Sequence, residues 1–340
     1  MKSRILYRLG GAFAACVLIL GACSSDDDAA SEPSTESTEA ASGDVKVGIA
    51  LSAASNDNGF SQAHYDGLVA ACAQVGCEVA VAENADDPQK QIDALKNLAA
   101  DNDLVIGVGA EFAAAGTSVA PQFPDVQFSI INGETSDAEN LHVYIINQGY
   151  AAYVAGAVAG EVTQSNTIGY LGGLDIPPTA GSEVGFELGA QSTNPDITYL
   201  SALVGDFTDS ARAKELATQL IAEGADVIYA YLDTATEGVI QAIEESGEEV
   251  KLITQAVAGC DVPGVIIAGT TLSTTAYVTT MVTDFTGGSL PSEPKVFALE
   301  NPEIQRVDLC SDVPAELQSV VDEATAGLND GTIELPETVI

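Results

Sequence analysis

The sequence predicts an α/β protein made of two Rossmann-like lobes, each built on a parallel sheet, that are joined by a hinge. Two observations lead to this fold class. From residue 44 onward, short β-branched runs alternate with amphipathic helical stretches, a pattern typical of parallel sheets covered by helices on both faces. A helix, a strand and the next helix then recur at a constant offset of 122 residues, as between Asp87 and Asp209.

The first lobe is expected over residues 44–148. Its first strand is predicted at 45–51, and the helix after it, at 60–75, has its apolar residues on one face. Asp87-Pro88 starts a second helix with proline at the first helical position. The other elements of this lobe are a helix that runs from there to about residue 100 and strands at 77–81, 104–108 and 127–131.

The second lobe is expected over residues 149–265. The repeat supports it, since Leu98 aligns with Leu220, Ile106 with Ile228 and Gly116 with Gly238. Strands are predicted at 167–171, 197–201, 227–231 and 251–256, and helices at 150–162, 179–190, 209–223 and 234–246. Residues 266–340 break this alternation, with a helix at 271–285 and a strand within 295–310. We expect this segment to cross back to the first lobe and return, closing the hinge.

The N-terminus predicts export and a lipid anchor. Three cations in residues 1–8 precede an apolar stretch of about 14 residues, which is typical of a secretory signal and shorter than the ~20 needed to span a bilayer. Leu20-Gly21-Ala22-Cys23 resembles a bacterial lipobox. We therefore expect removal of residues 1–22 and a lipid on Cys23, such as palmitate, at the extracytoplasmic face of the cell membrane. Residues 23–43 are acidic, lack large apolar side chains and predict a disordered linker.

Charge restricts the partners. The chain has 11 Lys and Arg against 50 Asp and Glu, a net charge of −39. Nucleic acids and anionic lipid surfaces require clustered cations, so we expect neither partner, and membrane contact through the lipid only. We also expect a monomer.

Cysteines Cys72, Cys77, Cys260 and Cys310 lie beyond the linker. In an exported protein, an even number suggests disulfides, and three pairings are open. We favour Cys72–Cys77, because these residues flank a tight turn at Gly76, and Cys260–Cys310. No Cys/His spacing indicates a zinc site, and no metal is expected.

Ligands of open parallel sheets bind outside the carboxyl ends of the strands. The loop after the first strand offers Asp57, a helix cap or a ligand contact, and Phe60, which could stack on a ring or only pack the helix onto the sheet. Further candidates at strand ends are Glu111, Phe112, Asn132, Phe207, Asp209, Asp233, Thr234 and Gln255.

Nothing in the sequence predicts catalysis. The folded part has only His64 and His142, and His64 is expected to pack on the apolar side of its helix. The motifs GxSxG, HExxH and Walker A are all missing, and Gly172-Gly173 does not form a GxGxxG motif. We expect no enzyme and no cofactor.

Several motifs, taken together and in order, resemble the basic membrane protein (BMP) family of bacterial lipoproteins. Its members look like type I periplasmic binding proteins and include receptors for purine nucleosides and for riboflavin. The matching stretches include Asp57-Asn58-Gly59-Phe60-Ser61-Gln62-Ala63, Ile168-Gly169-Tyr170-Leu171-Gly172-Gly173 and Gly205-Asp206-Phe207-Thr208-Asp209. The resemblance implies a solute receptor that delivers its ligand to an ABC permease. It also implies that Phe60 and Phe207 stack on the two sides of a flat ring, with Ser61 at a family asparagine position.

The chain departs from the nucleoside receptors at two places. Thr254-Gln255-Ala256 replaces an aspartate-bearing run, and Gly269-Thr270-Thr271-Leu272 replaces a Ser-x-x-Lys. The resemblance implies that charged residues at these two places bind the ribose in nucleoside receptors, and this chain lacks both charges. The expected ligand is therefore a nucleoside-like molecule or another flat heterocycle, with a sugar-like or other non-nucleoside ligand as the alternative. A ligand sensor that signals to a membrane kinase is the second functional class.

Overall fold

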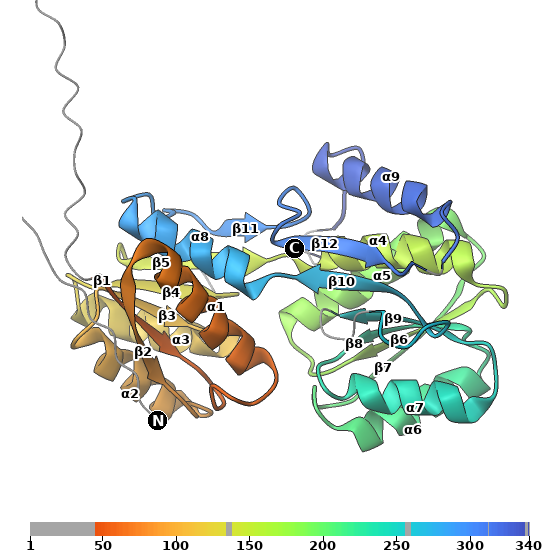
Figure 1. The fold of residues 1–340 in the computed structure, drawn as a ribbon, viewed down its shortest axis with the longest axis horizontal. Helices are drawn as coiled ribbons and strands as arrows, with labels where there is room; N and C mark the ends of the chain where they lie inside the picture. Colours follow the sequence, from red (N-terminus) through yellow and green to blue (C-terminus); the bar gives the residue numbers. More distant parts are fainter. Residues whose placement is uncertain (1–44, 134–137, 256–259, 312, 337–338, 340) are drawn as a thin grey trace, which may run out of the picture. The chain divides into compact units, whose positions relative to one another are not determined.

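The computed structural model describes residues 45–340 apart from 134–137, 256–259, 312, 337–338 and 340. The predicted signal segment, the linker and the lipidation residue Cys23 lie outside the described residues. The described chain forms two six-stranded sheets with helices on both faces of each (Figure 1). The α/β class with two sheets that are mainly parallel is thereby confirmed.

The first sheet has the strand order β11-β5-β4-β3-β1-β2, and its neighbouring strands are parallel. Its strands are β1 (Val45–Ala50), β2 (Cys77–Ala82), β3 (Leu104–Gly107), β4 (Gln127–Ile131), β5 (Leu141–Ile146) and β11 (Lys295–Phe297). Helices α1 (Phe60–Val75) and α8 (Thr274–Thr286) share one apolar core on this sheet, and α2 (Pro88–Ala99) and α3 (Ala113–Val119) share another. Short 3-10 turns at Ala110–Phe112 and Ala120–Gln122 flank α3.

The second sheet has the corresponding order β12-β10-β9-β8-β6-β7. Its strands are β6 (Thr167–Gly172), β7 (Thr198–Leu203), β8 (Val227–Tyr231), β9 (Lys251–Gln255), β10 (Ile266–Leu272) and β12 (Gln305–Leu309). One core contains α4 (Gln148–Val162), α5 (Pro177–Thr193) and α9 (Leu317–Asn329), and the other contains α6 (Ser210–Ala222) and α7 (Thr236–Ser246). Strand β12 runs antiparallel to β10, an exception to the predicted parallel order.

The 122-residue repeat corresponds to matching positions in the two sheets. Helices α2 and α6 begin at Pro88 and Ser210, and each leads to the third strand of its sheet, β3 or β8. Their caps match as well, since Asp87 accepts hydrogen bonds from the N–H groups of Gln89 and Lys90, and Asp209 accepts one from Arg212.

The prediction of a helix over 271–285 is wrong at its start. Thr271 and Leu272 end strand β10, which pairs with both β9 and β12. The helix begins only at Thr274, because the Ser273 side chain accepts a hydrogen bond from the N–H of Ala276 at 3.2 Å. Strand pairing on two sides outweighs the helical apolar spacing of this segment.

The last part of the chain contributes to both sheets. Helix α8 and strand β11 belong to the first sheet, and β12 and α9 to the second, so that in the described chain the connections at 147, 273 and 298–304 all pass between the sheets. These connections are bonded to one another. The N–H of Asn147 donates to the carbonyl of Phe297 at 2.8 Å, and the N–H of Ser273 donates to that of Ile304 at 2.7 Å.

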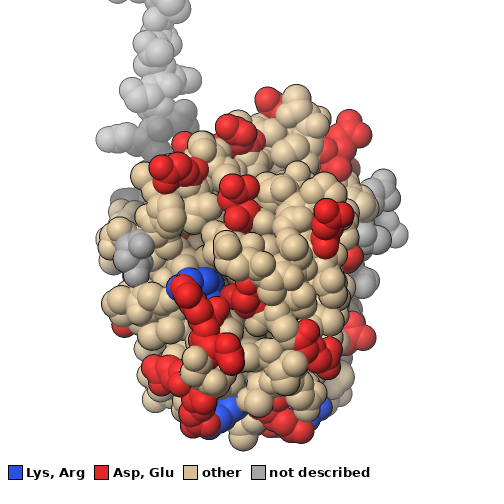
Figure 2. Space-filling view, turned by 90° about the vertical axis from the view of Figure 1, so that its right-hand side faces the viewer, with Lys and Arg blue, Asp and Glu red and all other residues tan. Residues whose placement is uncertain are grey.

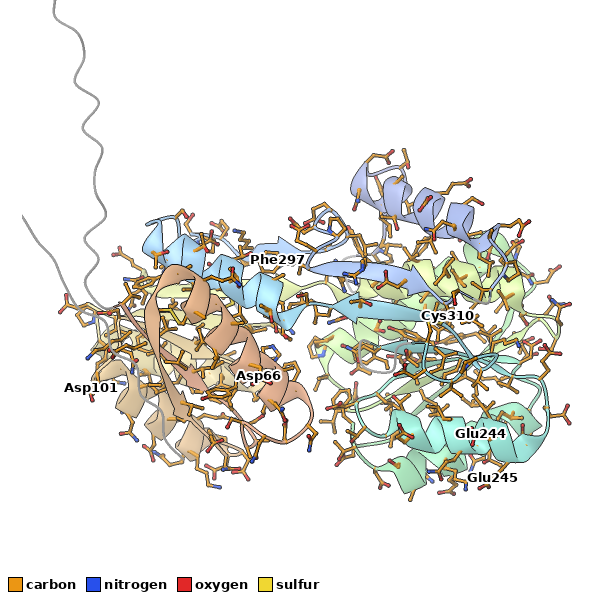
Figure 3. All side chains as sticks on the ribbon, viewed as in Figure 1. Asp66, Asp101, Glu244, Glu245, Phe297 and Cys310 are labelled. Carbon is orange, nitrogen blue, oxygen red and sulfur yellow. A yellow bond between two sulfur atoms is a disulfide. The ribbon has the colours of Figure 1, made fainter. Side chains whose placement is uncertain are left out.

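Strand β11 is secured by Phe297 (Figure 3), whose ring stacks on Tyr144 with 6.0 Å between the ring centres. Lys295 forms an ion pair of 2.7 Å with Asp284, which also accepts a hydrogen bond from the Tyr144 hydroxyl at 3.0 Å. These contacts join β5, α8 and β11. His142, on β5, is buried and contacts the Pro291 carbonyl and the Gln127 side chain, each at 2.8 Å.

Two disulfides link segments that adjoin strands. Cys72–Cys77 connects the end of α1 to the start of β2 across Gly76, whose φ of 81° is favourable for glycine. Cys260–Cys310 ties the segment before β10 to the residue that follows β12 (Figure 3). The Cα atoms of the two pairs are 4.6 and 5.4 Å apart. Within the described residues, every helix is too short or too polar to cross a membrane.

Candidate ligand-binding site at the carboxyl ends of the strands

The loop after β1 positions the start of α1. One carboxylate oxygen of Asp57 accepts hydrogen bonds from the N–H groups of Gly59 at 2.8 Å and Gln62 at 3.0 Å, and the other accepts from Ser61 at 3.3 Å. The buried Ser61 hydroxyl accepts from the N–H of Ala53 at 3.3 Å. Asp57 therefore caps the helix, and Ser61 anchors the loop.

Phe60 is the first residue of α1 and has a different environment. It is 45% exposed, the largest exposed fraction among the large apolar side chains of the described chain. Its ring lies over the imidazole of His64, with 4.1 Å between ring centres and an angle of 56° between the planes. A side chain that only packed the helix onto the sheet would be buried, so this exposure favours a ligand contact.

His64 lies one turn further along α1 and is completely buried, as predicted. Its Nδ1 is 2.7 Å from the carbonyl oxygen of Phe60, and its Nε2 is hydrogen-bonded to the hydroxyl of Tyr277 on α8. Burial lowers the pKa of His64 to about 4, although the Phe60 carbonyl and Asp57 oppose this change. The imidazole is therefore neutral at pH 7.

Asp233 follows β8 of the second sheet and contacts this same helix start. A Cβ atom on Gly59 would overlap its carboxylate, which also accepts a hydrogen bond from the N–H of Phe60. Its other oxygen, Oδ1, is buried and has no hydrogen-bond partner among the described residues. Burial, with the nearby charge of Asp57, raises the pKa of Asp233. Loops from the carboxyl ends of both sheets thus meet at Gly59 and Asp233.

Phe207 lies in the loop after β7. Its half-buried ring rests on Gly173, where any side chain would overlap it, and its centre is 6.3 Å from that of Tyr231 in an edge-to-face arrangement. The Phe207 carbonyl accepts hydrogen bonds from the N–H groups of Asp233 and Ala235, both at 3.1 Å. Phe207 and Asp233 are therefore held in one unit.

Two residues of this region were absent from the predicted set. Leu174, in the loop after β6, is 43% exposed, and Tyr231, at the end of β8, is buried beside Phe207. The Tyr231 hydroxyl is hydrogen-bonded to the side chain of Gln255, and burial raises its pKa. The position of Leu174 in the sequence could have indicated it. Leu174 follows β6, which has the same place in the second sheet as β1 has in the first, and the loop after β1 leads to Phe60.

Other predicted residues have structural roles. The side-chain oxygen of Asn132 accepts a hydrogen bond from the N–H of Ile146 at 2.8 Å, and its own N–H donates to the Tyr144 carbonyl at 2.7 Å. Its amide NH₂ group and one lone pair of its side-chain oxygen remain for a ligand. Thr234 is exposed, and its carbonyl accepts from the Ser210 hydroxyl at 3.3 Å. Phe112 is fully buried in the core, and Asp209 caps α6.

A cavity of about 710 Å³ lies elsewhere, at the amino ends of β8 and β9. Asp226, Lys251 and Gly264 line it, and the Lys251 ammonium donates to the Gly264 carbonyl at 2.9 Å. Asp226 is also occupied, since it accepts hydrogen bonds from Thr163, Gln164 and Ser165. This cavity is at the opposite strand ends from Phe60 and Asp233, where ligands of open parallel sheets bind, so it is not the candidate site.

The molecular surface is acidic. On the face shown in Figure 2, Asp and Glu are spread over the surface with few Lys or Arg between them. In the part of the chain that the structure describes, no group of three or more His, Cys, Asp or Glu could hold a metal ion.

Comparison with known proteins agrees with this fold. A solved solute-binding protein of an ABC transporter system from Conexibacter woesei superposes with a TM-score of 0.68 at 26% identity, covering 86% of this chain and 99% of its own. The arabinose-binding component of an ABC transporter from Shewanella sp. ANA-3 superposes with a TM-score of 0.62 over 85% of this chain and 97% of its own. At 16% identity, the second likeness supports the fold alone.

Curated relatives share parts of the sequence. Basic membrane protein A2 of Borrelia garinii is 24% identical over 61% of this chain and 62% of its own length. An ABC transporter nucleoside-binding protein of Lactococcus lactis is 30% identical over 37% of this chain and 36% of its own. The chain therefore matches less than two thirds of the length of these relatives.

The family described as ABC transporter substrate-binding protein, PnrA-like, matches residues 44–285. The match includes the α1 start and the Phe207 and Asp233 loops, and the family consists of solute-binding proteins and not of enzymes. The chain belongs to the PnrA-like family of ABC transporter substrate-binding proteins.

Proposed function

We propose that this protein is the extracytoplasmic solute-binding component of an ABC importer and that it binds a small molecule with a flat ring between the loops at Phe60 and Phe207. The observation that carries the proposal is the exposed ring of Phe60 at the point where the α1 start contacts Asp233. Ligands of open parallel sheets bind outside the carboxyl ends of the strands, and binding sites are lined mainly by apolar and aromatic side chains.

The chemistry of these residues supports a heterocyclic ligand. Stacking on an aromatic side chain contributes ~1–3 kcal/mol per base, and Phe60 and Phe207 supply two such rings. The Oδ1 atom of Asp233, which lacks a hydrogen-bond partner among the described residues, would accept an N–H or O–H group of the ligand. Gln255, which contacts Tyr231, is a further polar contact. We assign no ribose-binding charges to the site.

A thermal-shift screen tests this function on the purified full chain. Adenosine, guanosine, uridine, riboflavin, glucose and arabinose are added separately at millimolar concentration. A ligand present at 100 times its Kd stabilises the folded state by about 2.7 kcal/mol, which corresponds to a rise in Tm of about 4 °C for a folded chain of this length. If no compound with a flat ring raises Tm and a sugar does, the ligand class is the sugar-like alternative. If none of the six does, nucleosides, riboflavin and these two sugars are excluded as ligands of the proposed site.

The proposed location has its own test. We propose that Cys23 carries the lipid that keeps the protein beside its permease, while residues 24–43 act as a spacer. A Cys23→Ala variant expressed in a bacterial host should leave the membrane fraction, whereas Cys16→Ala should stay there, because Cys16 lies in the segment that is removed. Retention of Cys23→Ala in the membrane fraction would contradict the lipid anchor.

A further inference from the structure

His64 and Tyr277 form a buried polar pair directly behind the exposed ring of Phe60. The imidazole and phenol ring centres are 5.5 Å apart, and both side chains are fully buried. His64 contacts Phe60 in two ways, through its ring and through the hydrogen bond to the Phe60 carbonyl. Tyr277 is 213 residues further along the chain.

The hydrogen bonds fix the tautomer of His64. A carbonyl oxygen only accepts, so Nδ1 must carry the proton that it donates to Phe60. Because the imidazole is neutral, Nε2 then has a lone pair and accepts the hydroxyl proton of Tyr277. Both ring nitrogens are satisfied, and the plane of the imidazole is fixed at two opposite points.

Close packing of α8 on α1 brings Tyr277 to this position. At Gly67, one turn beyond His64, a Cβ atom would lie 3.2 Å from the backbone of Thr274, so the missing side chain lets the two helices approach. Tyr277 is one turn into α8, next to Thr274 in the helix start. Figure 1 shows α8 alongside α1 on one face of the first sheet.

We propose that His64 and Tyr277 are positioning residues that hold the Phe60 ring in the orientation required for stacking on the ligand; this inference rests on the proposed role of Phe60. Phe60 needs such support, because it is the first residue of its helix, follows a glycine and is nearly half exposed. A ring that is fixed before binding loses less conformational freedom when the ligand arrives, which increases affinity without any new contact.

A direct role for His64 in binding does not fit its surroundings. The imidazole is completely buried, and each nitrogen has a protein partner. Tyr277 is equally buried and its hydroxyl is used. Their influence on a ligand must therefore pass through Phe60.

The first experiment needs no ligand. 4-Fluorophenylalanine is placed at position 60 of the full chain, and the ¹⁹F resonance is recorded with Tyr277 intact and in Tyr277→Phe. The protein with Tyr277 intact should give one sharp line. Tyr277→Phe should give a broadened or split line, because the imidazole loses the hydrogen bond at Nε2 and keeps only the one at Nδ1. Tyr144→Phe is the matched control. It also removes one buried hydroxyl that reaches α8, at Asp284, but leaves His64 untouched. Equal lines in all three proteins would overturn the proposal.

A second experiment measures affinity by calorimetry with adenosine as the probe. Tyr277→Phe should weaken binding about threefold to tenfold, and Tyr144→Phe should leave it within twofold. In a Phe60→Ala background, Tyr277→Phe should cause no further loss, because the hydroxyl acts through that ring. A full further loss there would show that Tyr277 acts by another route and would overturn the proposal. If adenosine does not bind the unmodified protein, adenosine is excluded as the ligand, and the fluorine experiment, which needs no ligand, still decides the positioning role.

Discussion

Phe60 and His64 are one helical turn apart and have opposite environments. The phenyl ring is partly in solvent, whereas the imidazole is shielded from it and neutral. Asp57 adds a third role in the same loop, because its carboxylate is used by backbone N–H groups at the helix start. Of these residues, only Phe60 has a side chain that is free to meet a ligand.

Replacing Phe60 by alanine should weaken the binding of an aromatic ligand tenfold or more, through the loss of ~1–3 kcal/mol of stacking. Calorimetry with the best ligand of the screen measures the change. Stability should change little, because the ring is nearly half exposed. Val69→Ala removes another exposed apolar side chain of α1 and should not affect affinity. Unchanged affinity in Phe60→Ala would mean that this ring does not contact the ligand.

His64 should make the protein less stable in mild acid. Its pKa is about 4 in the folded state and 6.5 when unfolded, so the unfolded chain binds more protons between these values. Stability from this group is complete above pH 6.5 and falls by about 3 kcal/mol as the pH approaches 4. The raised pKa of Asp233 has the opposite effect, because its contribution to stability increases as the pH falls.

Urea unfolding of the unmodified protein and of His64→Gln at pH 7, 5.5 and 4.5 measures this effect. The difference between the two proteins isolates His64 from the other titrating groups. It should shrink as the pH falls, since glutamine has no proton to bind. A difference that stays constant with pH would mean that His64 does not keep its low pKa.

At the scale of elements, α4 and α5 pack with almost no space between their backbones. A Cβ atom on Gly189 would overlap the carbonyl oxygen of Tyr153, and one on Gly156 would overlap that of Phe186. Glycines on both helices therefore permit the contact. In an isolated helix these residues would be unfavourable, so their presence in both helices reflects packing and not helix propensity.

Gly189→Ala should destabilise the protein by about 2–3 kcal/mol, because the helices must separate. Helix propensity alone would give the opposite sign, a gain of about 1 kcal/mol. Gly269→Ala in β10 is the control, since its Cβ would meet Thr254 only at ordinary distances of 3.5 Å and more. Urea unfolding decides between the two signs, and a more stable Gly189→Ala variant would contradict the packing argument.

Local patterns were sufficient for most helices and strands, and insufficient where several chain segments meet. The runs at β1 and β8 were found because they are short, β-branched and bounded by turns. The full length of strand β10 was not predicted, because its pairing with β12 joins residues 33 to 41 apart. The antiparallel direction of β12 has no sequence signal for the same reason.

The same distinction between local patterns and contacts of distant segments applies to the candidate site. Asp57, Phe60 and Phe207 are proposed as site residues from their places after strands, whereas the contact of Asp233 with Gly59 was not predicted, because it joins loops of two different sheets. The contact of Tyr277 with His64 could not be predicted from the sequence for the same reason. Tyr277 lies far along the chain and reaches His64 only through the packing of α8 on α1.

At the scale of the whole molecule, charge is the dominant feature. The net charge is −39, and the cations that form ion pairs among the described residues are Lys90, Arg212, Lys214, Lys251, Lys295 and Arg306. Apart from Asp284, their partner carboxylates are largely exposed, and exposed pairs contribute little. Repulsion among the remaining acids therefore exceeds the attraction.

Salt should consequently stabilise the fold. The screening length falls from about 30 Å at 0.01 M to about 10 Å at 0.1 M salt, which weakens repulsion between distant carboxylates. We expect stability to rise by at least about 1 kcal/mol between these concentrations, or about 1.5 °C in Tm. Scanning calorimetry in NaCl and in KCl should give the same curve, because screening depends on ionic strength. A Tm that does not change with salt would contradict the conclusion that repulsion among the carboxylates exceeds the attraction of the ion pairs.

The path of the chain between the sheets also determines when the first sheet can be completed during synthesis. The first sheet begins at residue 45 but is completed only by α8 and β11, which end at Phe297. A ribosome that adds 5–20 residues per second needs roughly 8–30 s to make the 150 residues between Asn147 and Phe297. Until Tyr277 and the rest of α8 have been made, the emerging chain has α1 without α8, and His64 without Tyr277. The sheet that is begun first is therefore completed only after the final third of the chain has begun to emerge, and its uncovered apolar surface must be protected from aggregation until then.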